Sequence, residues 1–362
     1  MRLEPKEMPI ILTGGGTAGH VTPNLALIPE LKKRGVEIFY VGRKSGIEKG
    51  LLDKTDVRYY GISAGKLRRY FDLRNISDIF LVGAGFVQSF FLLRKLRPQV
   101  VFSKGGFVSC PLVWAAWLNG VPVIVHESDL TPGLANKLSA PFAERICYSF
   151  PETASAIPPE KAVFAGIPIR ESLLRGQSAK GRELCSFTDS KPVVLISGGS
   201  QGAESINRTV RGGLDRLLPQ YNLCHICGKG GLDATLEARP GYKQFEFVDE
   251  EWPHLLAMAD MVVTRAGATT IFELLELRKP NLLIPLTLGQ SRGDQILNAR
   301  SFEKRGFSKV LMEEDLSVET LDKAIDQTLE DCQSLTVSMA SAKSVNGTEK
   351  VISVIMEYLN GS

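Results

Sequence analysis

Two glycine-rich segments share the pattern of a phosphate-binding loop. Each runs from an apolar stretch into Gly-Gly-(Thr/Ser)-x-Gly, once in Ile10–His20 and once in Val193–Ala203. An apolar strand that enters such a turn leaves free backbone N–H groups above the sheet, beside the start of a helix. Such turns bind anions, usually phosphate. Because the two copies lie about half a chain apart, they predict two similar domains that face a cleft, with a nucleotide-activated substrate bound in it.

One histidine lies where it could take a proton from a reacting hydroxyl. His20 follows the first glycine loop, just ahead of a helix for which Thr22-Pro23 supplies the expected N-cap and first residue. The positive end of a helix disfavours a protonated imidazole, so we expect His20 to be neutral near pH 7 and to serve as a general base. Glu127 and Asp129 follow another apolar run, and we expect them to line the same cleft.

Several other chemistries are disfavoured by the surrounding residues. Gly14-x-Gly16-x-x-Gly19 fits the dinucleotide fingerprint, but the second expected strand runs into Arg43-Lys44 instead of an acid, which disfavours NAD and leaves NADP as an alternative. The second glycine loop lacks the Gly-Lys-Ser/Thr ending of nucleoside triphosphate hydrolases. Cys224 and Cys227 have the spacing of half a zinc site without a second pair, so we interpret them as core residues. The sequence therefore predicts neither a metal nor a cofactor.

The elements that must position these residues alternate between short β-rich runs and helix-length segments. This rhythm is typical of doubly wound parallel sheets, so the predicted fold class is α/β with two Rossmann-like domains. The expected strands are 10–13, 36–41, 57–62, 100–103, 121–126, 145–148 and 162–165, then 192–197, 222–227, 244–248, 261–264, 281–284 and 309–312.

A glycine and a proline mark the expected domain boundary. Gly166-Ile-Pro-Ile-Arg170 follows the last strand of the first half and interrupts regular structure. We therefore predict an N-terminal domain over 1–166 and a C-terminal domain over 167–345. An amphipathic helix over about 346–362 could pack back on the first domain. Thr131-Pro132 is expected to open a helix after Glu127.

Charge is concentrated in one stretch of an otherwise balanced chain. The 362 residues carry a net charge of +3, which is too small to indicate nucleic acid as a partner. Six cysteines scattered through the chain favour free thiols. Between residues 64 and 97, seven basic residues stand against two acids, among many apolar side chains.

That basic and apolar stretch is the candidate membrane patch. Asp78 and Gln88 interrupt its apolar run, so we expect it to rest on an anionic bilayer and not to span it. A core helix with a solvated basic rim is the alternative. Trp114 and Trp117 are expected to be core residues. The patch residues are Lys66, Arg68, Arg69, Phe71, Arg74, Ile79 and Phe80.

Taken together, these motifs make the chain resemble glycosyltransferase family 28 over nearly its full length. The family's enzymes add N-acetylglucosamine to the lipid-linked muramyl-pentapeptide of peptidoglycan. The matching segments are Gly15–His20, Gly105–Ser109, His126-Glu127, Gly133–Lys137, Gly166–Arg170, Gly198–Ala203, Arg265–Gly267 with Glu273, and Asp294–Ala299.

The resemblance implies a GT-B fold and an inverting, metal-independent transfer from UDP-N-acetylglucosamine to the C4 hydroxyl of the undecaprenyl-pyrophosphoryl acceptor, lipid I, which yields lipid II. It further implies a peripheral enzyme at the cytoplasmic face of the membrane, which serves cell-wall biogenesis, cell shape and cell division. Other cell-wall synthesis proteins are possible partners.

Residue by residue, the resemblance implies a donor site shared between the two domains. Ser200, Gln201 and Gly202 would bind the donor phosphates, with Thr17, Ala18 and Gly19 closing over them. Arg170 and the backbone of Val248 would hold uracil, and Glu273 the ribose. Ala268, Thr269, Thr270 and Gln295 would contact phosphate and sugar. His20 is the leading general base and Glu127 the other catalytic candidate.

The chain departs from the family pattern at two positions. Asp129 replaces an asparagine that contacts the sugar, and Asp294 replaces the first of two glutamines. Four alternatives stay open from the residues alone: a UDP-hexose glycolipid transferase acting on diacylglycerol, a UDP-N-acetylglucosamine 2-epimerase, an NADP oxidoreductase, and a UDP-sugar-binding protein without catalysis.

Overall fold

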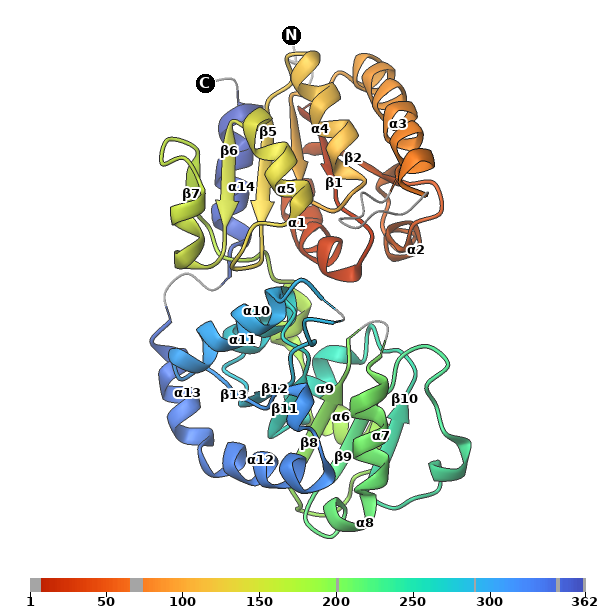
Figure 1. Cartoon of the computed structure of the whole chain (residues 1–362), viewed down its shortest axis with the longest axis vertical. Helices are drawn as coiled ribbons and strands as arrows, with labels where there is room; N and C mark the ends of the chain where they lie inside the picture. The colour runs from red at the N-terminus through yellow and green to blue at the C-terminus, as the bar shows by residue number, and fades with distance from the viewer. Residues whose placement is uncertain (1–7, 66–73, 200–201, 290, 343–345, 361–362) are drawn as a thin grey trace. The chain divides into compact units, whose positions relative to one another are not determined.

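The computed structural model describes residues 8–65, 74–199, 202–289, 291–342 and 346–360. The chain divides into two units, Met1–Arg170 with Asn346–Ser362, and Glu171–Val345 (Figure 1). The chain passes from the first unit to the second after Arg170, at the end of the segment Gly166–Arg170 in which the sequence predicts a boundary.

The first unit is built on a seven-stranded parallel sheet with the order β3-β2-β1-β4-β5-β6-β7. The order reverses direction between β1 and β4, which is the point where open α/β sheets bind ligands. The strands are β1 (Met8–Thr13), β2 (Val36–Arg43), β3 (Arg58–Ile62), β4 (Val100–Ser103), β5 (Val123–Glu127), β6 (Arg145–Tyr148) and β7 (Ala162–Phe164).

Helices cover both faces of this sheet. In β1, Ile10 and Leu12 pack against α1 and α14, while Ile11 between them packs on the opposite side with residues of α3 and α4. This alternation is expected of a parallel strand that is buried on both faces. The helices are α1 (Thr22–Lys33), α2 (Ile47–Leu52), α3 (Arg74–Leu96), α4 (Ser109–Leu118), α5 (Leu134–Ser139) and α14 (Thr348–Leu359), with 3-10 turns η1 (Ala18–His20), η2 (Ala140–Phe142) and η3 (Pro151–Ala156).

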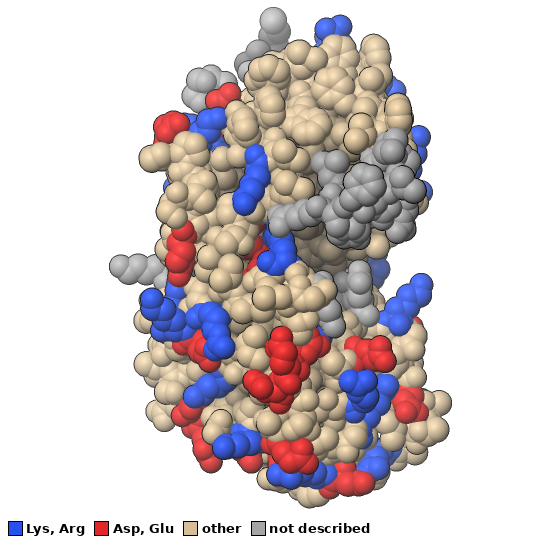
Figure 2. Space-filling model, viewed as in Figure 1, with Lys and Arg blue, Asp and Glu red and all other residues tan. Residues whose placement is uncertain are grey.

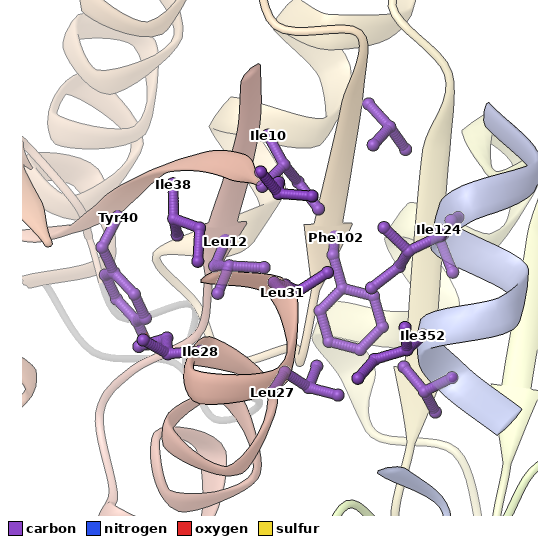
Figure 3. Packing of buried hydrophobic residues seen from close by; sticks show 14 of the residues in the cluster. Ile10, Leu12, Leu27, Ile28, Leu31, Ile38, Tyr40, Phe102, Ile124 and Ile352 are labelled. Carbon is purple, nitrogen blue, oxygen red and sulfur yellow. The ribbon is translucent and has the colours of Figure 1, made fainter. Parts of the chain in front are cut away.

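The C-terminal helix belongs to the first unit. Ile352 of α14 is fully buried in one core cluster with Phe102 and Ile124 (Figure 3). Just ahead of the helix, the N–H of Gly347 donates to the carbonyl of Ile167 at 2.8 Å. The chain therefore leaves the first unit at residue 170, builds the second, and returns to complete the first core.

The second unit repeats the architecture with six parallel strands in the order β10-β9-β8-β11-β12-β13. Its strands are β8 (Val193–Ser197), β9 (Asn222–Ile226), β10 (Tyr242–Phe245), β11 (Met261–Thr264), β12 (Asn281–Leu283) and β13 (Lys309–Val310). Its helices are α6 (Ser178–Cys185), α7 (Glu204–Gly212), α8 (Leu214–Leu217), α9 (Trp252–Met258), α10 (Ala268–Glu276), α11 (Asp294–Lys304), α12 (Val318–Glu330) and α13 (Cys332–Ala340), with η4 (Glu171–Arg175), η5 (Ala234–Leu236) and η6 (Glu313–Asp315).

The predicted fold class is confirmed, and three local predictions need correction. The strand expected over 244–248 is β10, which begins two residues earlier because Tyr242 pairs with Leu223. Thr22 is the first residue of α1 and Val21 its N-cap, while α5 starts at Leu134 after the N-cap Gly133 and not at Thr131-Pro132.

The cysteine predictions are confirmed. Cys224 and Cys227 are buried on or just after β9, and all six cysteines are free thiols.

A buried polar network ties β9 to α7 and β10. Nδ1 of His225 lies 2.8 Å from the Tyr242 hydroxyl, and Nε2 lies 2.9 Å from Oδ1 of Asn207. The amide of Asn207 donates to the Cys227 carbonyl at 2.8 Å, so its Oδ1 accepts from His225. The imidazole is therefore the neutral tautomer with its proton on Nε2.

This network predicts an acid sensitivity of the second unit. Burial lowers the pKa of His225 to about 3, whereas an unfolded histidine titrates near pH 6.5. Below pH 6.5 the unfolded chain takes up the proton first, so the free energy of unfolding falls by about 1.4 kcal/mol per pH unit towards pH 3. Urea unfolding at pH 7 and pH 5 should show a loss about 2 kcal/mol larger for the natural chain than for His225→Leu. An equal loss in both would contradict the assignment.

Candidate active site

Two glycine loops meet at the carboxyl edge of the first sheet. One follows β1 and the other follows β4, at the point where the strand order reverses. Gly106 adopts φ +84°, and a Cβ there would lie 2.2 Å from the carbonyl oxygen of Gly15. Only glycine therefore allows this approach of the two loops. The backbones of the two loops are therefore in direct contact at this edge.

His20 lies in the 3-10 turn η1, between the first of these loops and α1. Its Nδ1 is 3.0 Å from the hydroxyl oxygen of Thr17, and the ring is partly exposed. When Nδ1 carries the proton and donates it to Thr17, Nε2 keeps the lone pair that a general base requires. Thr17, Ala18 and Gly19 precede α1 on the same edge, so the structure brings these predicted residues together.

The other catalytic candidate, Glu127, is the last residue of β5 and is buried. Its carboxylate accepts the backbone N–H of Asp129 and of Gly133, both at 2.9 Å, and the amide of Asn136 at 2.8 Å. Burial, and next the charge of Asp129, raise the pKa of Glu127, while the three hydrogen bonds oppose the rise. Glu127 thus organises the loop that carries Asp129 and the start of α5.

The neighbouring His126 is neutral. Its Nε2 lies 2.8 Å from the carbonyl oxygen of Gly166, which can only accept a hydrogen bond. Burial, and next the charge of Lys104, hold the pKa of His126 well below its ordinary value. His126 therefore joins the edge of the sheet to the segment that precedes Arg170.

Sequence reasoning missed a buried cation at this edge. Lys104 directly follows β4 and is 1% exposed. Its ammonium group donates a hydrogen bond to the hydroxyl of Ser128. Burial lowers the pKa of Lys104 to about 8, although the carboxylates of Glu127 and Asp129 partly restore it. Its position between a strand end and Gly105-Gly106 was the available signal, since strand ends of parallel sheets carry ligand-binding residues.

In the second unit, the glycine loop leads into a helix whose start has no side-chain cap. α7 begins after its N-cap Ala203, whose methyl side chain cannot accept a hydrogen bond from the first turn. Uncapped N–H groups at a helix start favour an anion. Gly202 has φ +77°, and a Cβ there would lie 2.4 Å from the Cys227 carbonyl oxygen. Ser200 and Gln201 lie outside the described residues.

A cavity of about 1050 Å³ adjoins this loop, between α7 and the turn after β9. Arg208, Arg211 and Lys229 line it together with Gly202. The guanidinium of Arg211 donates to the side-chain oxygen Oε1 of Gln244 at 2.8 Å. These cations line the cavity along α7, together with the acids Glu204 and Asp233.

The predicted ribose and sugar residues gather on α10 and α11 at the same edge of the second sheet. Ala268, Thr269 and Thr270 form the first turn of α10, which also has no side-chain cap, and Glu273 follows one turn later, 5% exposed.

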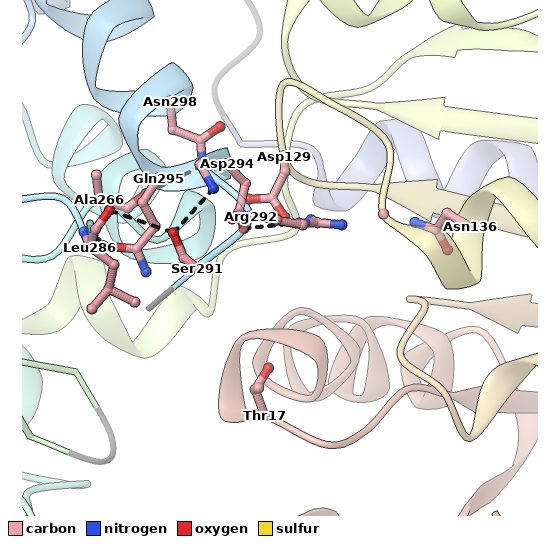
Figure 4. Close-up of polar contacts among 12 residues, drawn as sticks. Thr17, Asp129, Asn136, Ala266, Leu286, Ser291, Arg292, Asp294, Gln295 and Asn298 are labelled. Carbon is pink, nitrogen blue, oxygen red and sulfur yellow. Dashed lines mark hydrogen bonds and ion pairs between the residues drawn. The ribbon is translucent and has the colours of Figure 1, made fainter. Parts of the chain in front are cut away.

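Two side chains of α11 hydrogen-bond to the loops that follow β12 and β11. Gln295 accepts the N–H of Leu286 through Oε1 at 3.1 Å, and Asn298 donates to the Ala266 carbonyl at 3.2 Å (Figure 4). Val248 lies beyond the end of β10, and Arg170 is the last residue of the first unit. Within the described residues, no group of three or more His, Cys, Asp or Glu side chains could hold a metal ion.

Comparisons with known proteins bear on both units. The family model for the glycosyltransferase family 28 N-terminal domain matches residues 10–148, and the model for its C-terminal domain matches residues 193–355. A protein of Clostridium kluyveri is 54% identical over 350 residues, which cover 96% of this chain and 99% of the relative. A Clostridium novyi protein is 52% identical over 96% of this chain and 98% of its own length. Both carry the name UDP-N-acetylglucosamine–N-acetylmuramyl-(pentapeptide) pyrophosphoryl-undecaprenol N-acetylglucosamine transferase.

Solved structures agree on the fold. Acinetobacter baumannii MurG superimposes with a TM-score of 0.74 at 23% identity, over 96% of this chain and 99% of its own. The UDP-GlcNAc 2-epimerase of Neisseria meningitidis superimposes with a TM-score of 0.70 at 14% identity, over 98% and 100%. At such identities the likeness concerns the fold alone. Since the family models cover the glycine loops of both units, and relatives above 50% identity span almost the whole chain, the chain belongs to glycosyltransferase family 28.

Proposed function

We propose that the chain transfers N-acetylglucosamine from UDP-N-acetylglucosamine to the C4 hydroxyl of N-acetylmuramyl-(pentapeptide) pyrophosphoryl-undecaprenol, and so forms lipid II for peptidoglycan. The observation that carries the proposal is the 54% identity to curated transferases of that name over 96% of the chain. The matched family models span the glycine loops of both units together with α10 and α11.

The reaction follows from the two edges. The oxygen of the acceptor C4 hydroxyl attacks C1 of N-acetylglucosamine from the face opposite UDP, and the bond from C1 to the diphosphate oxygen breaks with its electron pair. Configuration at C1 is thereby inverted. Nε2 of His20 takes the hydroxyl proton. The uncapped start of α7 meets the charge that develops on the leaving diphosphate.

The acceptor carries a long lipid, so a membrane contact belongs to the proposal. Phe80, Val87 and Phe91 of α3 recur at a spacing that places them on one side of the helix, and they are 75%, 52% and 64% exposed. Ile79 is 62% exposed. On α4, which packs beside α3, Trp117 is 58% exposed, so the expectation that it belongs to the core is wrong. Apolar side chains grouped in this way favour an interface.

The charge distribution is consistent with such a contact. Few charged side chains lie on the visible face of the first unit, whereas acidic and basic side chains are mixed over the second (Figure 2). Arg94 of α3 stacks on Phe90, 4.6 Å from its ring centre. Of the predicted patch, Lys66, Arg68, Arg69 and Phe71 lie outside the described residues, as does the side chain of Arg74.

By length and composition, Asp78–Leu96 of α3 would suffice to cross a membrane. The topology argues against a crossing. β1 pairs with β2 on one side and with β4 on the other, and α3 lies between β3 and β4 in the chain. A crossing would place paired strands on opposite sides of the bilayer. We therefore propose a peripheral attachment at the cytoplasmic face.

The membrane contact makes a quantitative prediction. Replacing Phe80 and Phe91 together with serine should lower binding to vesicles rich in phosphatidylglycerol by about tenfold or more, because each buried aromatic side chain contributes about 1.5–3 kcal/mol. Vesicle co-sedimentation measures it. Val337→Ser, which removes a 66% exposed apolar side chain from the second unit, should leave binding unchanged. Undiminished binding of the double variant would place the contact elsewhere.

The transferase activity is tested with labelled UDP-N-acetylglucosamine and three parallel reactions in EDTA. One contains a lipid I analogue, one contains diacylglycerol, and one contains no acceptor. Product on the lipid I analogue alone supports the proposal. Product on diacylglycerol would assign a glycolipid transferase, and epimerised free donor would assign an epimerase.

A further inference from the structure

A buried ion pair lies at the carboxyl edge of the second sheet, outside the residues assigned to the donor. Nη2 of Arg265 is 2.6 Å from Oε1 of Glu313, and the two side chains are 8% and 7% exposed. Removing two charges from water is costly, and well-packed apolar residues often serve stability equally well. Stability alone therefore gives a weak reason for charges at this position.

The pair joins four segments that follow the ends of β8, β11, β12 and β13. Arg265 itself follows β11 and leads into α10. Its Nη1 donates to the carbonyl of Ile284 after β12 at 3.1 Å, and its Nη2 donates to the hydroxyl of Ser205 at 3.2 Å. Glu313 lies in η6 after β13 and also accepts from Ser205. Ser205 is the second residue of α7, directly after the glycine loop.

Three of these four segments carry predicted donor-binding residues. They are the glycine loop with Gly202, the first turn of α10 with Ala268–Thr270, and the stretch from β12 to Gln295. The hydrogen bonds of a sheet hold strands only up to their ends. Beyond the strands, side-chain hydrogen bonds help to set the spacing of these loops. Arg265 donates to the start of α7 and to the stretch after β12, and it lies just ahead of α10.

The pair supplies no net charge to the site. Burial raises the pKa of Glu313, but the hydrogen bonds from Arg265 and Ser205 and the charge of Arg265 outweigh that effect, so the carboxylate stays ionised. Arg265 is thereby neutralised by its partner. Attraction for a diphosphate must come from the backbone N–H groups of the loops and the cations near α7.

We propose that the Arg265–Glu313 pair, acting through Ser205, is a positioning device that sets the glycine loop and the start of α7 for the donor diphosphate. Neither residue contacts the donor. The proposal rests on the proposed function only for the identity of the donor as a UDP-sugar.

The test compares UDP with uridine, since the pair should affect only the diphosphate part. UDP binding to the full chain is measured by calorimetry and uridine binding by ligand-observed NMR. Ser205→Ala removes the hydrogen bonds between the ion pair and α7 and leaves the pair in place, whereas Glu313→Gln weakens the pair itself. We expect the Kd for UDP to rise about tenfold in Ser205→Ala, equivalent to about 1.4 kcal/mol, and further in Glu313→Gln. The Kd for uridine should stay within about twofold in both variants.

A second ion pair of the same unit gives the matched control. Nε of Arg216 in α8 is 2.5 Å from Oδ2 of Asp322 in α12, at the end of α7 remote from the glycine loop. Asp322→Asn should lower the melting temperature and leave both Kd values unchanged. An unchanged UDP-to-uridine ratio in Ser205→Ala and Glu313→Gln would overturn the proposal, as would an equal shift in Asp322→Asn. The transferase proposal fails separately, when the natural chain binds UDP but transfers no sugar.

Discussion

Replacing His20 with alanine is expected to lower the turnover of sugar transfer by about 10²–10⁴-fold while UDP binding stays within about twofold. A loss of turnover of this size is typical for removal of a general base. The imidazole lies at the carboxyl edge of the first sheet, and its Nδ1 is 3.0 Å from the hydroxyl oxygen of Thr17. Initial rates on a lipid I analogue and calorimetry with UDP measure the two effects separately.

The other histidines provide the control. His126 and His225 are buried and hydrogen-bonded, so they cannot approach an acceptor. His254 accepts the backbone N–H of Gln177 at 3.0 Å, so it serves the local structure of the second unit. His254→Ala should therefore keep its turnover. A His20→Ala variant with undiminished turnover would remove His20 from the mechanism.

Glu127→Gln is expected to lower the free energy of unfolding of the first unit by about 2–4 kcal/mol. The carboxylate accepts three hydrogen bonds in a buried position, and an amide can accept at only one of its two ends. At least one buried donor then faces an NH₂ group. Urea unfolding compares the variant with Glu144→Gln, an exposed acid of the same unit that should change little.

This measurement separates the two candidates for the general base. Because the loop that carries Asp129 depends on Glu127, we expect activity and stability to fall together in Glu127→Gln. Conversely, a variant with full stability and lost turnover would make Glu127 the base. In His20→Ala, by contrast, we expect turnover to be lost with little change in stability.

Much of the fold was predictable because its signals are local. In β1, and again in β8, the apolar run and the glycine turn that follows it lie within a dozen residues. Each of these signals can therefore be recognised from one short segment. The general position of the candidate site follows from the same signals, since ligands of parallel sheets bind at the carboxyl ends of strands. His20 and the residues of α10 lie at those ends.

The errors arose where distant segments compete with local preferences. α5 starts at Leu134 and not at Thr131-Pro132, where the carboxylate of Glu127 takes the N–H of Gly133. Trp117 is exposed although its spacing from Trp114 is that of a core helix, because helical periodicity does not say which side meets the sheet.

The sequence by itself determined two parallel sheets with glycine-rich turns at strand ends, since apolar runs and glycine turns are encoded by neighbouring residues. Only the tertiary structure decided which charges are buried and paired. Lys104 meets Ser128 from another strand end, and Arg265 meets Glu313 across 48 residues of chain. The physical reason is that the free energy of a buried charge depends on the groups that surround it in the folded protein. Strand pairing brings these groups together from distant parts of the chain.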